Sequence, residues 1–211
     1  IVASPKKDFT YAERDLMEGY FNNGGKAIFL FDYLESDPSF NELNNLLGKF
    51  NLAINYDKVR ETDESRHVPK DPYTMLVDVS SNSIVPNKFS TYLTNSRSLS
   101  ILKNEKEYIK TTSLIRTSEN AVGEMVNKSR GDDIKGPLDL AVAVEYEGVQ
   151  EPSKVIAISN SSFINDNAYR IYGDYYLANM NFFLSCVNWM VEIKDDIIIP
   201  TKNYEVNRFS I

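Results

Sequence analysis

Cysteine and histidine are nearly absent from the sequence. Cys186 is the single cysteine and His67 the single histidine among 211 residues. One cysteine cannot form an internal disulfide, and the two residues together cannot supply the four ligands of a structural zinc site. A chain of this length removes roughly 70% of its unfolded surface from water on folding. We therefore expect a fold that needs neither disulfide nor metal, and we expect no cofactor.

Basic residues and long apolar runs are also scarce. The 30 acidic residues outnumber the 23 basic ones and give a net charge of −7. A phosphate-binding surface needs clustered Lys and Arg, so this balance argues against nucleic acid as a partner. No apolar run reaches the roughly 20 residues that span a bilayer, and no signal-peptide pattern opens the chain. Because the sequence opens on the apolar stretch Ile1-Val2-Ala3, we expect a fragment of a longer protein, with any membrane segment outside it.

Helix and strand signals alternate in the first third of the chain. Residues 10–13 (TYAE) and 39–42 (SFNE) both fit the capping box, in which a hydroxyl and an acidic side chain cap a helix start. We expect a helix after each, the first one ending at the two glycines 24–25. Residues 26–31 (KAIFLF) form an apolar run without an alternating polar face. Such a run is typical of a strand buried on both faces of a parallel sheet.

The rest of the chain predicts further strands and one long helix. The expected elements are a solvated loop at 57–73, short strand pieces between 73 and 115, buried strands at 138–146 and 154–159, an aromatic helix at 175–193 and a last strand at 197–199. The alternation favours one α/β domain over residues 1–211, with a mostly parallel sheet flanked by helices. Residues 57–136 would form an irregular, β-rich insertion or subdomain within it.

One polar loop is the strongest candidate for a ligand site. It comes directly after a predicted buried strand and consists of Ser159, Asn160, Ser161 and Ser162. Doubly wound proteins place ligand-facing loops at this position, although a polar turn at a strand end is the simpler interpretation. Ser161 and Ser162 are also the only candidate nucleophiles at a strand-to-helix turn. The G-x-S-x-G elbow is absent and no histidine follows as a base, so we expect no catalytic residue here.

Three other groups of residues could suggest a binding or catalytic site, and each has a simpler structural interpretation. The glycines at 24–25 follow a helix and precede a strand, which reverses the order that a phosphate-binding loop needs. The acidic pairs at 132–133 and 195–196 lack the ligand spacing of an EF-hand loop. Cys186 lies among bulky apolar residues, which predicts a buried and unreactive thiol. We therefore expect no metal site and no catalytic cysteine.

A group of tyrosines precedes the long helix and leaves two interpretations open. Its members are Tyr169, Tyr172, Tyr175 and Tyr176. Aromatic side chains bury large areas, which favours packing of these rings against the helix. Stacking of the rings on sugars is the alternative, and it would make the chain a carbohydrate-binding module.

Several blocks of the sequence resemble a known family. Residues 4–9 (SPKKDF) and 20–32 (YFNNGGKAIFLFD) are similar to the opening signature of GldG-like proteins, the auxiliary components of ABC-type transport systems first associated with gliding motility. Residues 43–52 (LNNLLGKFNL) resemble the helix and strand that follow in that family. Three later blocks also match in the family's order, at 155–163 (VIAISNSSF), 179–190 (NMNFFLSCVNWM) and 197–202 (IIIPTK). The segment from about 57 to 135 has no counterpart that we can name.

The resemblance implies both a fold and a function. The fold is a flavodoxin-like or glutamine-amidotransferase-like α/β domain without a catalytic nucleophile. The function is that of a non-catalytic accessory domain on the extracytoplasmic side of the cell membrane, held there by anchors outside this stretch and acting by protein or ligand contact. The implied partners are a membrane permease or other auxiliary subunits of an ABC transport system. An amidotransferase-like hydrolase or transferase, with Ser161 or Ser162 as nucleophile, and a carbohydrate-binding module stay open as alternatives.

Overall fold

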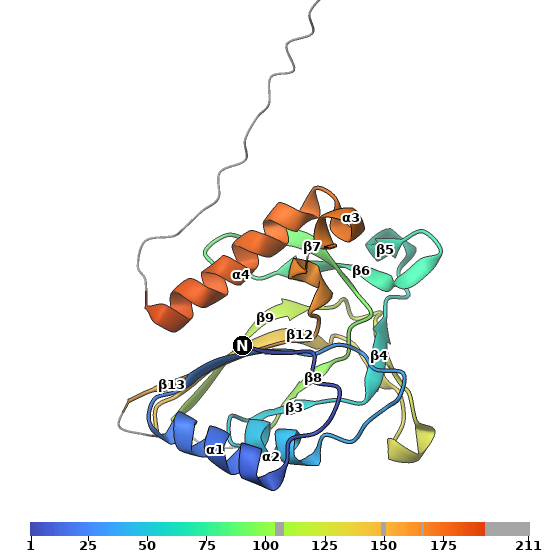
Figure 1. Cartoon of the computed structure of the whole chain (residues 1–211). Coiled ribbons are helices and arrows are strands. Elements are labelled where there is room, and N and C mark those ends of the chain that lie inside the picture. The colour runs from blue at the N-terminus through green and yellow to red at the C-terminus, as the bar shows by residue number, and fades with distance from the viewer. Residues whose placement is uncertain (104–107, 149–150, 166, 193–211) are drawn as a thin grey trace, which may run out of the picture.

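A mixed, curled sheet runs through the centre of the molecule (Figure 1). The computed structural model describes residues 1–103, 108–148, 151–165 and 167–192. In spatial order the main sheet contains β1 (Val2–Ala3), β2 (Lys26–Leu30), β13 (Ser153–Ile158), β12 (Asp139–Tyr146), β9 (Ile109–Arg116), β6 (Asp71–Val79) and β5 (His67–Val68). Three further strands join this sheet from the side. β7 (Phe89–Thr94) pairs with β6, and β8 (Leu99–Ile101) pairs with β12. β3 (Leu52–Ile54) pairs in turn with β8.

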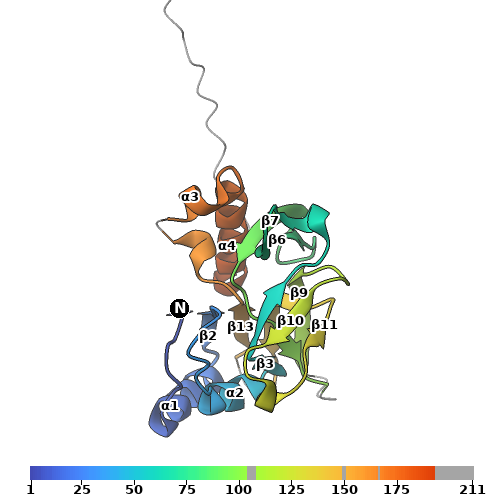
Figure 2. The ribbon, with the colours of Figure 1, turned by 90° about the vertical axis from the view of Figure 1, so that its right-hand side faces the viewer.

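A smaller sheet lies beside the main one. Its three antiparallel strands are, in order, β11 (Ile134–Lys135), β10 (Val122–Met125) and β4 (Asp57–Arg60). Figure 2 shows β10 and β11 on the side of the molecule away from α1 (Tyr11–Asn22). Residues 57–136 therefore supply this small sheet together with strands β5 to β9 and the short 3-10 helices η1 (Glu64–Arg66) and η2 (Lys128–Arg130). Their division from the rest of the chain as an insertion stays a prediction.

Parallel pairing is confined to one side of the main sheet. Among the described strands only β1–β2 and β2–β13 are parallel, whereas β12 is antiparallel to both β13 and β9. The expected flavodoxin-like or glutamine-amidotransferase-like fold with a mostly parallel sheet is therefore wrong. An apolar run indicates that a strand is buried on both faces, and here the antiparallel β12 is buried on both faces as well.

Helices cover the two faces of the central strands. Figure 1 shows α1 and α2 (Asn41–Gly48) on one face and α3 (Ala168–Tyr172) and α4 (Tyr175–Val191) on the other. Alternate residues of each strand enter separate cores. Ile28 and Ile156 pack with Phe182 of α4, whereas Phe29 and Val155 belong to the core of α1 and α2. One sheet thus supports two apolar layers.

The two apolar runs that the sequence indicates are neighbouring strands inside this sheet. β2 lies parallel to β13, with Ile28 opposite Ile156. Phe29, Ile156 and Ala157 are fully buried. The prediction that these runs are buried central strands is confirmed, although the sheet around them is mixed.

The first two helices begin in different ways. Thr10 caps α1 as predicted, because its hydroxyl accepts a hydrogen bond from Glu13 N and its own amide donates to the Glu13 carboxylate. The predicted capping box of α2 is wrong, because the Ser39 hydroxyl accepts a hydrogen bond from Arg130 and not from the helix. The Asp8 carboxylate caps α2 instead, accepting hydrogen bonds from two first-turn amides at 2.9 and 3.0 Å.

Gly24 and Gly25 end α1, as predicted. Gly24 has a φ of 75°, a conformation that residues with a side chain rarely adopt. A Cβ atom on Gly25 would overlap the ring of Tyr20, so this position also requires a glycine. The chain passes directly from these glycines into β2. Because a strand follows them, they do not form a phosphate-binding loop at a helix start.

The region predicted as a solvated loop, 57–73, contains strands. β4 and β5 lie within it, and β6 begins in it. His67 belongs to β5, where it pairs with Met75 of β6. The loop prediction is wrong because polar residues of these strands are satisfied inside the protein. Asp57 of β4, for example, is fully buried and accepts hydrogen bonds from the amide and the hydroxyl of Ser98.

The long C-terminal helix lies close to its predicted position. α4 spans Tyr175–Val191, compared with the expected 175–193. The predicted strand at 197–199 lies outside the described residues. Among the helices that the structure describes, none has both the length and the apolar character needed to cross a bilayer.

Candidate functional site

The candidate loop lies at the carboxyl ends of two parallel strands. Asp32 comes two residues after β2, and Ser159 directly follows β13. Because these strands are parallel neighbours, their carboxyl ends meet at one edge of the sheet. Asp32 Oδ1 accepts a hydrogen bond from Ser161 N at 2.7 Å, and Oδ2 accepts one from Ser161 Oγ at 2.6 Å. The Asp32 carboxylate thus fastens the loop to the end of β2.

Asn160 fixes the same loop from within. It is 1% exposed, and its Oδ1 accepts hydrogen bonds from Phe163 N at 2.8 Å and Ser162 Oγ at 2.9 Å. Its Nδ2 donates to the carbonyl of Thr94, the last residue of β7. These bonds hold the short helix η3 (Ser162–Ile164) against β7. Asn160 therefore stabilises the loop, and few of its hydrogen-bonding groups are left to bind a ligand.

The two remaining serines, Ser159 and Ser162, differ in their contacts. Ser162 Oγ lies 2.9 Å from Tyr172 OH. Burial raises the pKa of Tyr172, so its hydroxyl stays protonated. Ser159 is fully buried, and its hydroxyl has no hydrogen-bond partner in the described part of the chain. The structure thus brings the four predicted residues together. The side-chain hydrogen bonds of Asn160, Ser161 and Ser162 run within the protein, and the Ser159 hydroxyl makes none in the described residues.

A nucleophile in this loop would need a base, and the candidates are the imidazole of His67 and the carboxylate of Asp32. His67, the only imidazole, lies on β5, four strands beyond β13 in the main sheet. Asp32 is closer, because its Oδ2 accepts a hydrogen bond from Ser161 Oγ at 2.6 Å, the contact that a base makes with a nucleophile, while its Oδ1 accepts one from Ser161 N. A hydrolase needs a nucleophile, a base and a group that orients the base. Ser161 and Asp32 supply a hydroxyl and a carboxylate in contact, but no imidazole joins them in the described part of the chain.

Sequence reasoning missed two residues of this site, Asp32 and Lys6. Lys6 Nζ lies 4.0 Å from Asp32 Oδ2 and donates a hydrogen bond to Ser4 Oγ at 2.6 Å. The Asp32 side chain is 22% exposed and the Lys6 side chain 65%. A signal for Asp32 was present, because it is the first acidic residue after a predicted buried strand. Lys6 had no such signal, since only the folded chain brings it to this edge.

The tyrosine group does not form a flat platform. Tyr172 is buried in the core beneath α4, and Tyr176 packs against that core. Tyr175 meets Tyr92 edge to face, with ring centroids 4.8 Å apart and an angle of 81° between the rings. Tyr169 meets Tyr176 in the same way at 6.2 Å and 89°. Rings at right angles to each other offer no common surface on which a sugar could stack.

Cys186 is buried, and Asp133 of the first acidic pair is engaged in contacts within the protein. Cys186 is fully buried, and this burial raises the pKa of its thiol, which keeps it protonated and unreactive. Asp133 pairs with Lys128 and accepts a hydrogen bond from Met125 N at 2.8 Å. Both contacts hold the pKa of Asp133 below its ordinary value. It therefore belongs to a surface ion pair, and the second acidic pair, at 195–196, lies outside the described residues.

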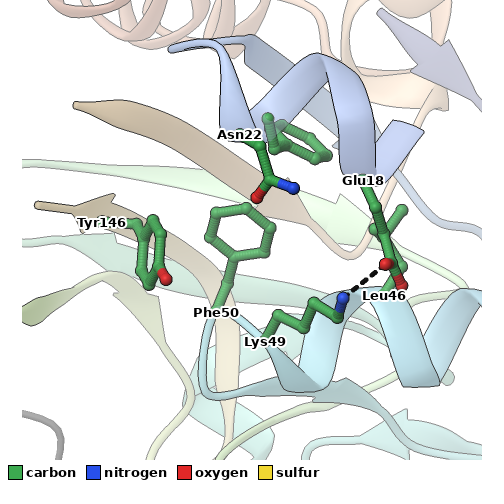
Figure 3. A pocket seen from close by; sticks show the side chains of 7 residues that line it. Glu18, Asn22, Leu46, Lys49, Phe50 and Tyr146 are labelled. Atoms are coloured by element: carbon green, nitrogen blue, oxygen red, sulfur yellow. Dashed lines mark ion pairs between the residues drawn. The ribbon is translucent and has the colours of Figure 1, made fainter. Parts of the chain in front are cut away.

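A small socket opens at the opposite end of the sheet, between α1, the end of α2 and β12 (Figure 3). Its volume is about 30 Å³. Phe21, Phe50 and Tyr146 form its aromatic wall, with centroids 4.7 Å apart in the first pair and 5.8 Å in the second. An ion pair between Glu18 and Lys49 closes the rim. This space suits one or two waters or the end of one aliphatic side chain.

Comparisons with known proteins find a neighbour in fold and no family. No protein-family model matches the chain, and no curated protein matches it significantly. Among solved structures, the chain is similar to one described as mmIFT52 N-terminal domain, with a TM-score of 0.62 and 18% sequence identity. The match covers 93% of this chain and 77% of the other. At this level of identity the likeness shows the fold alone, and that fold is the mixed, curled sheet and not a flavodoxin-like one.

Proposed function

We propose that this chain is a non-catalytic accessory domain of an ABC-type transport system, acting outside the cytoplasm by protein or ligand contact. The observation that carries the non-catalytic part is the set of internal hydrogen bonds in the loop after β13. Ser161 uses both its amide and its hydroxyl on Asp32, and Asn160 is bonded to the turn and to β7. A hydrolase would need an activated group in this loop, whereas a binding domain does not.

The transport assignment is supported by sequence blocks that resemble GldG-like auxiliary components. The blocks at 20–32 and 155–163 correspond to β2 and β13 together with the residues that meet after them, Asp32 and Ser161. On this proposal the chain lies at the outer side of the cell membrane. Its attachment comes from segments outside this stretch, and its partners are a permease or other auxiliary subunits of the transport system.

The exposed side of α1 is the face on which we expect a partner subunit. Leu16 is 75% exposed and Tyr20, one helical turn further on, is 49% exposed. The Tyr20 hydroxyl donates to Lys26 O at 2.9 Å and accepts from Lys26 N at 3.0 Å, which fixes the ring in place. Preorganised aromatic side chains beside an aliphatic one are frequent anchors of protein interfaces.

Co-purification tests the transport assignment. The genes beside that of this protein would be read first, and we expect an ATPase and a permease among them. The full-length protein would then be co-expressed with these two, and we expect a complex that survives detergent extraction. Leu16→Asp should abolish the complex without unfolding the domain. Leu177→Asp, which changes a 37% exposed residue on α4, is the matched control and should keep it. Failure of the wild-type protein to form the complex, or its location in the cytoplasm, would overturn the assignment.

An activity screen tests the hydrolase or transferase alternative. We expect no turnover of ester, amide or glycoside substrates above the buffer rate, because His67, the single imidazole of the sequence, lies four strands away from the loop of Ser161. Turnover that Ser161→Ala abolishes and Cys186→Ala leaves intact would favour the amidotransferase-like alternative. Saturable binding of oligosaccharides that is lost in Tyr169→Ala would favour the carbohydrate-binding module.

A further inference from the structure

We propose that a cleft between the two sheets binds a small carboxylic acid with an apolar body. The cleft has a volume of about 270 Å³. Its walls come from β8 of the main sheet, from β11 of the small sheet and from the segment that leads into β12. Ligand sites frequently occupy such junctions between packed units. This inference does not depend on the proposed transport function.

The charges around the cleft favour an anion. Arg116, at the end of β9, and Lys135, on β11, line it together with one acid, Asp139. The Asp139 carboxylate is already occupied, because it accepts hydrogen bonds from Arg116 Nε at 2.8 Å, from Arg116 Nη2 at 3.2 Å and from Ser113 Oγ. Two cations against one acid leave a local excess of one positive charge on a chain whose net charge is −7.

Arg116 is held in position for a ligand. Its paired contact with Asp139 fixes the plane of the guanidinium group, and a shift of register in β12 between Asp139 and Ala141 places the acid beside it. Arg116 Nη1 makes no hydrogen bond in the described part of the chain, and Lys135 forms no ion pair there. The Arg116 side chain is 52% exposed, so a ligand can reach it.

The rest of the lining suits a short apolar body. Leu99 and Leu138 are buried beneath the cleft, and Ile134 is half-buried at its side. On another wall, Ser100 Oγ donates a hydrogen bond to Asn55 Oδ1 at 3.0 Å. The volume lies below the roughly 300–1000 Å³ of sites for drug-sized molecules, which limits the ligand to a small molecule. A single excess charge suits a monocarboxylate better than a dianion.

Titrations followed by amide NMR test this proposal on the whole chain. The probes are hexanoate, its neutral counterpart hexanamide, and acetate, which keeps the charge and lacks the apolar body. We expect saturable shifts with hexanoate at the amides of Ser100, Ile134 and Lys135. Hexanamide and acetate should each bind at least about tenfold more weakly, because each lacks one of the two interactions. Absence of saturation with hexanoate, equal binding of hexanamide, or shifts that avoid the cleft would overturn the proposal.

Variants separate the cleft from the general surface. Lys135→Gln should weaken hexanoate binding by about threefold, the effect of one exposed charge. Lys7→Gln, which changes an exposed lysine on the loop before α1, is the matched control and should leave the affinity unchanged. Arg116→Gln should weaken binding further, provided that its amide spectrum shows a folded protein. Affinity that is unchanged in Lys135→Gln would overturn the proposal even if Arg116→Gln failed to fold.

Discussion

Gly19 and Gly123 differ in what an added side chain would meet. A Cβ atom on Gly123, in β10, would overlap Asp57 Oδ2. That oxygen is held by a hydrogen bond from Ser98 and cannot move freely. At Gly19, in the middle of α1, nothing in the described part of the chain lies within 4 Å of an added Cβ. Substitution by alanine should therefore change the free energy of unfolding in opposite directions at the two positions.

Gly123→Ala should lower the free energy of unfolding by about 1–3 kcal/mol, because the overlap forces a buried carboxylate to shift. Gly19→Ala should raise it by about 0.4–1 kcal/mol, because alanine favours a helix and restricts the unfolded chain. Urea denaturation of both variants measures these changes. Midpoints that moved in the same direction would contradict this reading of the two sites.

Cys186 should behave as a core residue and not as a reactive thiol. Cys186→Ala removes one buried heavy atom, so the free energy of unfolding should fall by about 0.5–1.5 kcal/mol, as for other deletions of this size. A thiol reagent should label the native protein slowly and the urea-unfolded protein at once, because burial raises the pKa of the thiol. Rapid labelling under native conditions would disprove the structural role.

At the scale of elements, the two N-terminal helices depend on different capping residues. Thr10→Ala should lower the free energy of unfolding by about 1 kcal/mol, and Asp8→Ala by about 1–2 kcal/mol, since each removes a cap. Ser39→Ala is the control, with an expected change within about 0.5 kcal/mol, because this residue does not cap α2. Urea denaturation measures all three. If Ser39→Ala lowered the free energy of unfolding as much as Asp8→Ala, the assignment of Asp8 as the cap of α2 would be refuted.

The cap of α1 should make stability depend on pH. Hydrogen bonds from the Thr10 amide and hydroxyl hold the pKa of Glu13 below its ordinary value of 4.5. Because the folded state favours the ionised form, the stabilisation is present above pH 4.5 and is lost as the pH falls through the lower folded value. Glu13→Gln should therefore be less stable than the wild type at neutral pH, and the difference should shrink toward about pH 3. A matched substitution, Glu119→Gln at an exposed position, should show no such trend.

The sequence patterns predicted elements better than their partners. The apolar runs of β2 and β13 and the Thr10 box are local signals, and the structure contains them where they were expected. The direction of neighbouring strands is not local, because β12 reads as an apolar run whether its neighbours are parallel or antiparallel. The cap of α2 could not be predicted from local sequence either, because Asp8 lies more than thirty residues before the amides that it caps.

At the scale of the whole molecule, the two cores should unfold together. Leu46 of α2 is fully buried on one face of the sheet, and Trp189, the only tryptophan, lies on α4 on the other. Leu46→Ala should lower the free energy of unfolding by about 2–5 kcal/mol. Because β2, β12 and β13 contribute to both cores, Trp189 fluorescence and far-UV circular dichroism should report the same lowered midpoint. A fluorescence midpoint that did not move would indicate independent layers.

The candidate site shows the same limit of sequence reasoning at this scale. The loop Ser159 to Ser162 follows the buried strand β13, as the sequence indicated, and its role as a ligand site stays a prediction. The groups that bind them come from elsewhere, with Asp32 from the end of β2 and Thr94 from β7. These contacts exist only once the chain has folded, so the internal character of the hydrogen bonds could not be predicted.

The pairing of β2 with β13 also has a consequence for folding during protein synthesis. Ile28 lies opposite Ile156, 128 residues later in the chain. At about 5–20 residues per second, a ribosome needs roughly 6–26 s to make that stretch. During this interval the apolar run of β2 has no strand partner on that side, so the nascent chain carries an exposed hydrophobic segment until β13 has been made. We expect the yield of native protein to depend on chaperones that shield the nascent chain.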